Sequence, residues 1–103
     1  MIQYSLHENG EYLDVKLAGD LDIDGTEVIE EELIPNMEKY QTVNINFEGV
    51  RFVDSTGMGL LMNMVQSLKE KGIKVTISNV QQDVMNVFEI LQLPEILGEE
   101  IFI

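Results

Sequence analysis

An acid, two adjacent hydroxyls and two glycines stand together near the middle of the chain, in the segment DSTGMG (Asp54 to Gly59). The residues before this segment alternate as in a strand, and the apolar residues after it recur at helical spacing. At the start of a helix an acidic or hydroxyl side chain is first of all a cap, which stabilises the helix by about 1 kcal/mol. The same position presents unpaired N–H groups and partial positive charge, so it suits an anion such as phosphate. A hydroxyl there could carry that phosphate covalently.

The glycines of this segment, Gly57 and Gly59, indicate that it does more than cap a helix. In the first helical turn each glycine lowers helix stability by up to about 1 kcal/mol relative to alanine. The two glycines must therefore serve a purpose other than helix stability. Because glycine has no side chain, it leaves the backbone open to close approach by a ligand or by another protein. We therefore interpret the segment as a candidate site, with Ser55 and Thr56 as its hydroxyls.

Nucleophilic catalysis by Ser55 lacks the residues that it needs. A hydrolase elbow reads G-x-S-x-G, whereas Val53 stands two residues before Ser55. The only histidine, His7, lies at the end of the first predicted strand, and nothing brings it to the hydroxyl. The chain has no cysteine and no P-loop or kinase signature. We predict no catalytic residue, no cofactor and a protein that is not an enzyme.

Charge and composition narrow the class of partner. The chain has 6 basic and 19 acidic residues, a formal net charge of −13, which repels nucleic acid and anionic membranes. Such acidity either serves solubility alone or matches a partner with a basic docking face. Without cysteine the 103 residues form no disulfide and no thiolate metal site. The sequence shows no leader-like segment, and none of its apolar runs approaches the roughly 18 residues that a membrane span needs. We therefore expect a cytoplasmic protein.

The hydrophobic pattern predicts strands and helices in alternation. Strands are predicted over 2–6 and 13–17, joined by a hairpin at Asn9-Gly10, over 43–47, ending at Gly49, and over 74–78. Helices are predicted over 26–40, bending or ending near Pro35, over 57–71, and over 84–91, closed by Pro94; residues 101–103 could add an edge strand. The βαβ unit between residues 43 and 78 is expected to be parallel and right-handed. We predict an α/β fold, a single domain over 1–103 with a mixed sheet of four or five strands and helices packed against it.

Three features together resemble a STAS domain, and more narrowly a stand-alone anti-sigma factor antagonist of bacterial partner-switching systems. They are the segment VDSTGMGLL, the sequence GDLD (Gly19 to Asp22) ahead of the first predicted helix, and the order of the elements. The resemblance covers essentially the whole chain. In that family an anti-sigma factor, itself a serine kinase, phosphorylates a hydroxyl of the D-S-x-G loop. The unphosphorylated antagonist binds this kinase and releases the sigma factor, and a metal-dependent serine phosphatase resets it.

Carried onto this chain, the resemblance implies a set of site residues. Ser55 would be the phosphoacceptor, with Thr56 as the alternative because relatives differ in which hydroxyl they use. Asp22 and Asp54 would flank the site, and Gly57 and Met58 would belong to the surface that binds the partner. We further expect the phosphate to block binding at the interface without rearranging the domain.

Two other functions remain open from the sequence. In one, the chain is a STAS-like scaffold or transport-associated module in which Ser55 is only a cap. In the other it binds calcium, because Asp20 to Glu31 (DLDIDGTEVIEE) matches the EF-hand loop pattern. An EF-hand loop follows a helix, whereas a strand is predicted here, and Glu27 stands where an aliphatic residue is usual. A cap at Asp24 would hold Glu31 on the next helix, so we favour an acidic capping turn over a metal site.

Overall fold

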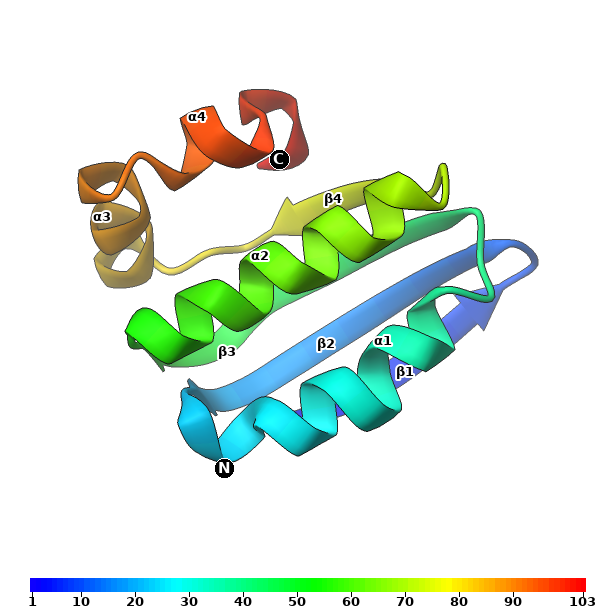
Figure 1. Cartoon of the computed structure of the whole chain (residues 1–103), viewed down its shortest axis with the longest axis horizontal. Helices are drawn as coiled ribbons and strands as arrows, with labels where there is room; N and C mark the ends of the chain where they lie inside the picture. The colour runs from blue at the N-terminus through cyan, green and yellow to red at the C-terminus, as the bar shows by residue number, and fades with distance from the viewer.

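Four strands form one mixed sheet in the computed structural model, which describes all 103 residues (Figure 1). In the order in which they pair, the strands are β1 (Gln3–Asn9), β2 (Tyr12–Leu21), β3 (Thr42–Val53) and β4 (Lys74–Ser78). β1 runs antiparallel to β2, whereas β2, β3 and β4 run parallel to one another. Gly10 has a φ of 64° in the hairpin, as the Asn9-Gly10 turn predicts. The predicted α/β fold with a mixed sheet is confirmed, with β1, β2 and β3 longer than expected.

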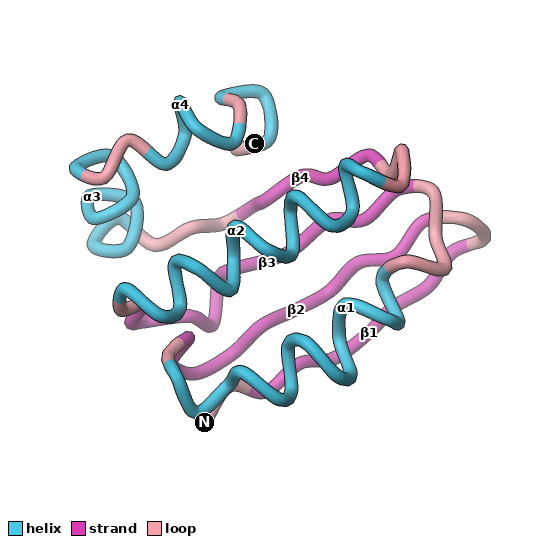
Figure 2. Tube along the Cα trace, in the orientation of Figure 1, coloured by secondary structure: helices cyan, strands magenta, loops and turns pink.

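Helical segments connect the parallel strands and follow the last one. Between β2 and β3 lie the 3-10 turn η1 (Ile23–Gly25) and a continuous helix made of the π-helical η2 (Val28–Leu33) and α1 (Ile34–Met37). The remaining segments are α2 (Ser55–Glu70) between β3 and β4, then α3 (Gln82–Ile90), α4 (Leu93–Leu97) and the 3-10 turn η3 (Glu99–Ile101). α1 and α2 lie over the same face of the sheet, and the loops gather at its two ends (Figure 1, Figure 2).

The face of the sheet beneath these helices holds the hydrophobic core. Val43, Ile45 and Phe47 of β3 are fully buried there, in the alternation that the sequence predicts. The ring of Phe47 meets that of Phe88 on α3 edge to face, with 6.1 Å between the ring centroids. One cluster of 28 buried apolar residues therefore joins the sheet to α1, α2 and α3.

The opposite face of the sheet is polar and centred on Asn44, which is only 7% exposed. Its Nδ2 donates to Asp14 Oδ1 at 2.8 Å and to Ser78 Oγ at 3.0 Å, and its Oδ1 accepts from Thr76 Oγ1 at 2.8 Å. This one amide cross-links three strands, because its partners belong to β2 and β4. No buried side-chain donor or acceptor lacks a partner, so burial of the amide carries no penalty for unmade hydrogen bonds.

The helix that contains Pro35 continues two residues beyond it, to Met37. The N–H of Ile34 donates to the carbonyl of Ile29, five residues back, so the helix is wider than an α-helix just before the proline. A wider turn accommodates a residue that has no N–H and whose ring crowds the preceding turn. The predicted end near Pro35 is thus confirmed, and Tyr40 lies beyond the helix.

Two predictions about the last part of the chain are wrong. Pro94 begins a helix instead of ending one: α3 stops at Ile90, and Pro94 lies in the first turn of α4, where a missing N–H costs nothing. Residues 101–103 do not form a fifth strand, because the chain turns there as η3. Only Phe102 then makes a single parallel bridge, to Ile77.

Replacing Asn44 by alanine is expected to lower the free energy of unfolding by about 1–3 kcal/mol, because Asp14 loses a donor and Thr76 an acceptor. Urea denaturation measures the difference. Asn63→Ala is the control, since its amide makes one exposed hydrogen bond, to Glu30 at 3.3 Å, and its loss should stay within about 0.5 kcal/mol. Equal losses at the two positions would show that the network does not hold the strands together.

Candidate functional site

The segment Asp54 to Gly59 lies at the carboxyl ends of the parallel strands. The ends of β2 and β3 are paired, Leu21 with Val53, so Asp22 and Asp54 leave the sheet from neighbouring positions. The start of α3 lies against the end of β3, because both line one hollow. Loops from several strands meet at such an edge, which is where parallel sheets usually bind ligands. We call the surface of residues 20–25, 51–56 and 81–84 the carboxyl edge.

Asp54 is the cap of α2, and the two hydroxyl residues follow it. Its backbone is extended (φ −96°, ψ −173°), and its Oδ1 accepts the N–H of Gly57 at 2.8 Å. Ser55 and Thr56 are therefore the first two residues of a 16-residue helix, and both are exposed. The N–H groups of a first turn have no partner inside the helix. An anion attached to either hydroxyl would thus lie at the positive end of the helix.

Gly57 and Met58 lie inside the domain, which corrects the expectation that Gly57 is small in order to admit a ligand or a partner. A Cβ on Gly57 would stand 1.9 Å from the carbonyl oxygen of Leu21, so the close approach is made by the chain's own β2. Met58 is 6% exposed and belongs to the core. Gly59 differs, because it is exposed and has open space where a Cβ would be. The open surface at the start of α2 is formed by the two hydroxyl residues and Gly59.

The acidic segment Asp20 to Glu31 forms a capping turn and not a calcium loop. Strand β2 enters it, where an EF-hand has a helix. Asp22 Oδ1 accepts the N–H of Asp24 at 3.1 Å and caps η1, so the cap is Asp22 and not the predicted Asp24. Glu31 lies on the helix that follows. No three acidic, histidine or cysteine side chains of the structure are arranged to hold a metal ion.

Two exposed apolar residues of the carboxyl edge were not predicted from the sequence as part of the site. Ile23 is 67% exposed and Phe52 is 51% exposed. Ile23 stands between two aspartates, and that contrast was a signal in the sequence. For Phe52 there was none, because two register shifts between β2 and β3 interrupt the alternation before it. A bulge of this kind changes the face of the sheet on which the following side chains lie. The simple alternation of strand residues then no longer predicts which side chains are exposed.

Carboxylates outnumber basic side chains at the carboxyl edge. Its acidic residues are Asp20, Asp22, Asp24, Asp54 and Asp83, and its single basic residue is Arg51. At the opposite end of the parallel strands, Lys39, Lys71 and Lys74 are offset by Glu11, Glu38 and Glu70, and Lys71 pairs with Glu38 at 3.9 Å. The candidate hydroxyls therefore lie on an edge where carboxylates outnumber basic side chains.

His7 is far from both hydroxyls. It is exposed on β1 and lies opposite Asp14 of β2 in the strand register, and Asp14 lies opposite Asn44 of β3. From Asn44 to Val53, the end of β3, the strand rises by roughly 30 Å at about 3.3 Å per residue. The structure therefore does not bring His7 to Ser55.

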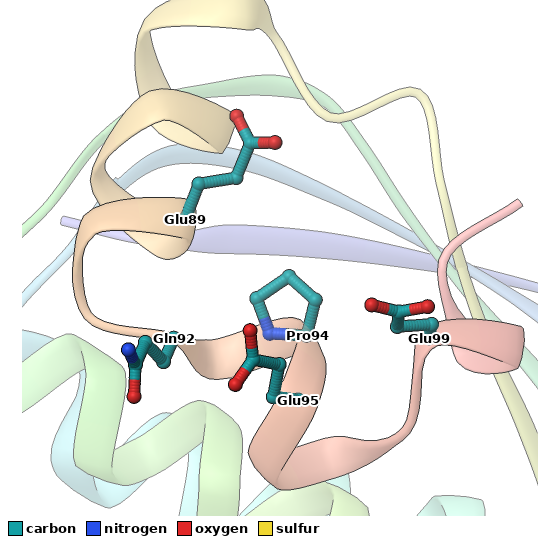
Figure 3. A pocket seen from close by; sticks show the side chains of 5 residues that line it. All are labelled: Glu89, Gln92, Pro94, Glu95 and Glu99. Atoms are coloured by element: carbon teal, nitrogen blue, oxygen red, sulfur yellow. The ribbon is translucent and has the colours of Figure 1, made fainter.

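A second acidic region lines a hollow of about 160 Å³ between α3 and α4 (Figure 3). The lining residues are Glu89, Gln92, Pro94, Glu95 and Glu99. The three carboxylates come from α3, α4 and η3, no lysine or arginine lines the hollow, and the cluster is not arranged to hold a metal ion. Nothing in this hollow indicates a ligand.

Comparison with known proteins finds the same fold in proteins of two kinds. The STAS domain family matches residues 3–102. The anti-sigma-B factor antagonist of Bacillus subtilis (strain 168) is 26% identical over 96 residues, which are 93% of this chain and 88% of the relative. The structure of the anti-sigma factor antagonist SpoIIAA in its unphosphorylated form has a TM-score of 0.76 at 24% identity, covering 98% of this chain and 86% of that one. A sulfate transporter family protein from Wolinella succinogenes has a TM-score of 0.80 at 18% identity, covering 93% and 79%. In the present structure no helix has the length and apolar content that a membrane crossing requires.

Gly57→Ala is expected to lower the free energy of unfolding by about 1–3 kcal/mol or to prevent folding, because a methyl group has no room against the Leu21 carbonyl. Gly59→Ala is the matched control in the same turn. It meets open space and should raise stability by up to about 1 kcal/mol, since alanine favours the helix. Thermal and urea unfolding followed by circular dichroism measure both. A Gly57→Ala protein as stable as the wild type would contradict the close approach.

Proposed function

Because the chain belongs to the STAS domain family, we propose that it is an anti-sigma factor antagonist whose binding is switched by phosphorylation of Ser55. Unphosphorylated, it binds an anti-sigma factor serine kinase in the cytoplasm, and that kinase releases its sigma factor. Phosphorylation ends the binding, and a metal-dependent serine phosphatase restores it. The observation that carries the proposal is the exposure of Ser55 as the first residue of α2, directly after the Asp54 cap. Similarity to an anti-sigma-B factor antagonist over 93% of the chain supports it.

The chain is a substrate in this account and not an enzyme. The kinase binds ATP and transfers the terminal phosphoryl group to the Ser55 hydroxyl oxygen, ADP leaves, and the hydroxyl proton passes to a base of the kinase. The chain needs no cofactor, because it supplies only a hydroxyl that a second protein can reach. Thr56 is the next residue and is also exposed, so it stays the alternative acceptor.

Asp22 and Asp54 are suited to bind the kinase beside the acceptor. Each is half-buried and uses its Oδ1 to accept a backbone N–H, so its Oδ2 is available to a lysine or arginine of the kinase. Gly57 and Met58 contribute from beneath the surface, because their packing holds the loop in place. The binding surface itself is formed by the two aspartates and the two hydroxyl residues.

A phosphate on Ser55 would weaken binding at the interface. Phosphoserine carries about −1.5 to −2 charge at pH 7, and the helix N-terminus offsets this by only about 0.3–2 kcal/mol. Covering that charge beside Asp54 would cost several kcal/mol when it is unpaired. Since about 1.4 kcal/mol changes affinity tenfold, this cost weakens binding by about a hundredfold or more.

A transport-associated module or scaffold is the second candidate function, favoured by the TM-score of 0.80 with the sulfate transporter family protein. In that case Ser55 is only the first residue of a capped helix. The two candidates differ in whether a kinase modifies the chain.

Incubation with ATP, magnesium and each anti-sigma factor serine kinase encoded in the source genome is expected to add one phosphate. Peptide mass spectrometry should place it on Ser55, because that exposed hydroxyl follows the cap directly. Ser55→Ala should abolish it, whereas Thr56→Ala, the neighbouring control, should retain it. Phosphate on Thr56 alone would move the acceptor by one residue. If no kinase modifies either hydroxyl, the transport-associated module is the better account.

The phosphorylated chain is expected to bind the kinase at least about a hundredfold more weakly than the unphosphorylated chain, as measured by calorimetry. Its amide NMR spectrum should change only for residues of the carboxyl edge and the first turns of α2, because no core contact is broken. Large shifts in β1 or α4 would contradict a mechanism that acts at the interface.

A further inference from the structure

A hollow of about 180 Å³ opens at the carboxyl edge, between the end of β3 and the start of α3. Its lining residues are Arg51, Phe52, Val53, Asp83, Val84 and Val87. Val53 precedes Ser55 by two residues, so the hollow and the hydroxyl belong to the same edge of the sheet. Figure 1 shows α3 and the start of α2 at the same end of the molecule. A protein that holds Ser55 in its active site would therefore reach this hollow.

The hollow is lined mainly by apolar side chains. Val53 and Val84 are 8% and 3% exposed, whereas Phe52 and Val87 remain 51% and 39% exposed. Four of the six lining residues are apolar. A phenylalanine left half in water forgoes the free energy that burial would give. A partner that inserts an apolar side chain here would gain that free energy, as the central residues of protein interfaces do.

The charge around the hollow favours a basic partner. Asp83 lines it from the exposed first turn of α3, and Asp54 caps the neighbouring helix. Arg51 also lines the hollow and balances Asp83 there, but it is the only cation of the carboxyl edge, against five carboxylates. A second copy of this chain has the same net charge of −13, so its approach would bring like charges together. A surface with lysine or arginine beside an apolar residue is complementary instead.

We infer that this hollow is a second docking point for the anti-sigma factor kinase, and that it receives one apolar side chain of the kinase flanked by a lysine or arginine. This role rests on the proposed function, because phosphorylation of Ser55 identifies the partner. Ser55 does not line the hollow, so the contact made there is equally strong before and during phosphoryl transfer. Such uniform binding lowers the KM for the chain without changing kcat.

Steady-state phosphorylation of Ser55, by a kinase that modifies the wild-type chain, tests this docking point. Phe52→Ser and Val87→Gln each remove one exposed apolar wall, and each should raise KM by about tenfold or more while kcat stays within about twofold. Ile90→Gln is the matched control. Ile90 lies on the same helix as Val87, is apolar and 78% exposed, and does not line the hollow. Its KM should stay within about twofold of the wild type, and thermal unfolding shows that each variant is folded.

Asp83→Asn tests the charge of the partner. Removing this carboxylate should raise KM about two- to tenfold and make KM less sensitive to sodium chloride, because an attraction to a basic group is lost. A KM that falls on this substitution would show that the kinase surface at the hollow is acidic, and the assigned occupant would be wrong.

The outcomes separate the docking point from the proposed function. Unchanged KM in both Phe52→Ser and Val87→Gln would overturn the docking point, while phosphorylation of the wild-type chain would still support the antagonist. A fall in kcat at unchanged KM would also overturn it. A wild-type chain that no kinase phosphorylates overturns both. If sedimentation shows a wild-type dimer that both variants dissociate, the hollow holds a second copy and not the kinase.

Discussion

The carbonyl group of Leu21, the last residue of β2, fixes where α2 begins. It accepts the N–H of Asp54 at 3.3 Å, and the same oxygen leaves no space for a side chain on Gly57. These contacts hold the first turn of α2 against the end of a neighbouring strand, directly after Leu21 pairs with Val53. Because Asp22 follows Leu21, the chain at Asp22 leaves the sheet next to the start of α2. The position of Ser55 therefore depends on a backbone contact between two segments that are far apart in the sequence.

This arrangement keeps a carboxylate next to the acceptor in both states of the proposed switch. The Asp54 side chain is held by the N–H of Gly57 at 2.8 Å, and losing such a cap would cost about 1 kcal/mol. The carboxylate therefore stays in place when a phosphate arrives on Ser55, so two anions are presented to the partner together. Beneath them, Met58 and Leu61 belong to the core, which gives the loop no internal space in which to turn the new charge away. In the proposed switch, the surface that binds the kinase before phosphorylation is thus the surface that repels it afterwards.

The sequence predicted the elements better than the contacts between them. Alternation identified β3 through Val43, Ile45 and Phe47, and helical spacing identified α2, because both patterns record local burial against one core. The loop Asp54 to Gly59 was predicted as a candidate site from its residue types, and Ser55 was predicted as its phosphoacceptor from the family resemblance. The reason why residue 57 is a glycine could not be predicted, because the space for a side chain is taken by the carbonyl group of Leu21 in another strand. Phe52 was missed for a related reason: the register shifts between β2 and β3 depend on pairing that a single strand does not encode.

Charge and apolar surface have different parts in the recognition proposed for the carboxyl edge. Its carboxylates act over distance, so they speed the approach of a basic partner. Such attraction is screened by salt beyond about 8 Å at physiological ionic strength, and by itself it selects a partner poorly. Phe52 and Val87 act only at contact, where they favour a partner of matching shape. A substrate protein without catalytic residues can therefore still be selective, because selection lies in where it is held and not in the hydroxyl that reacts.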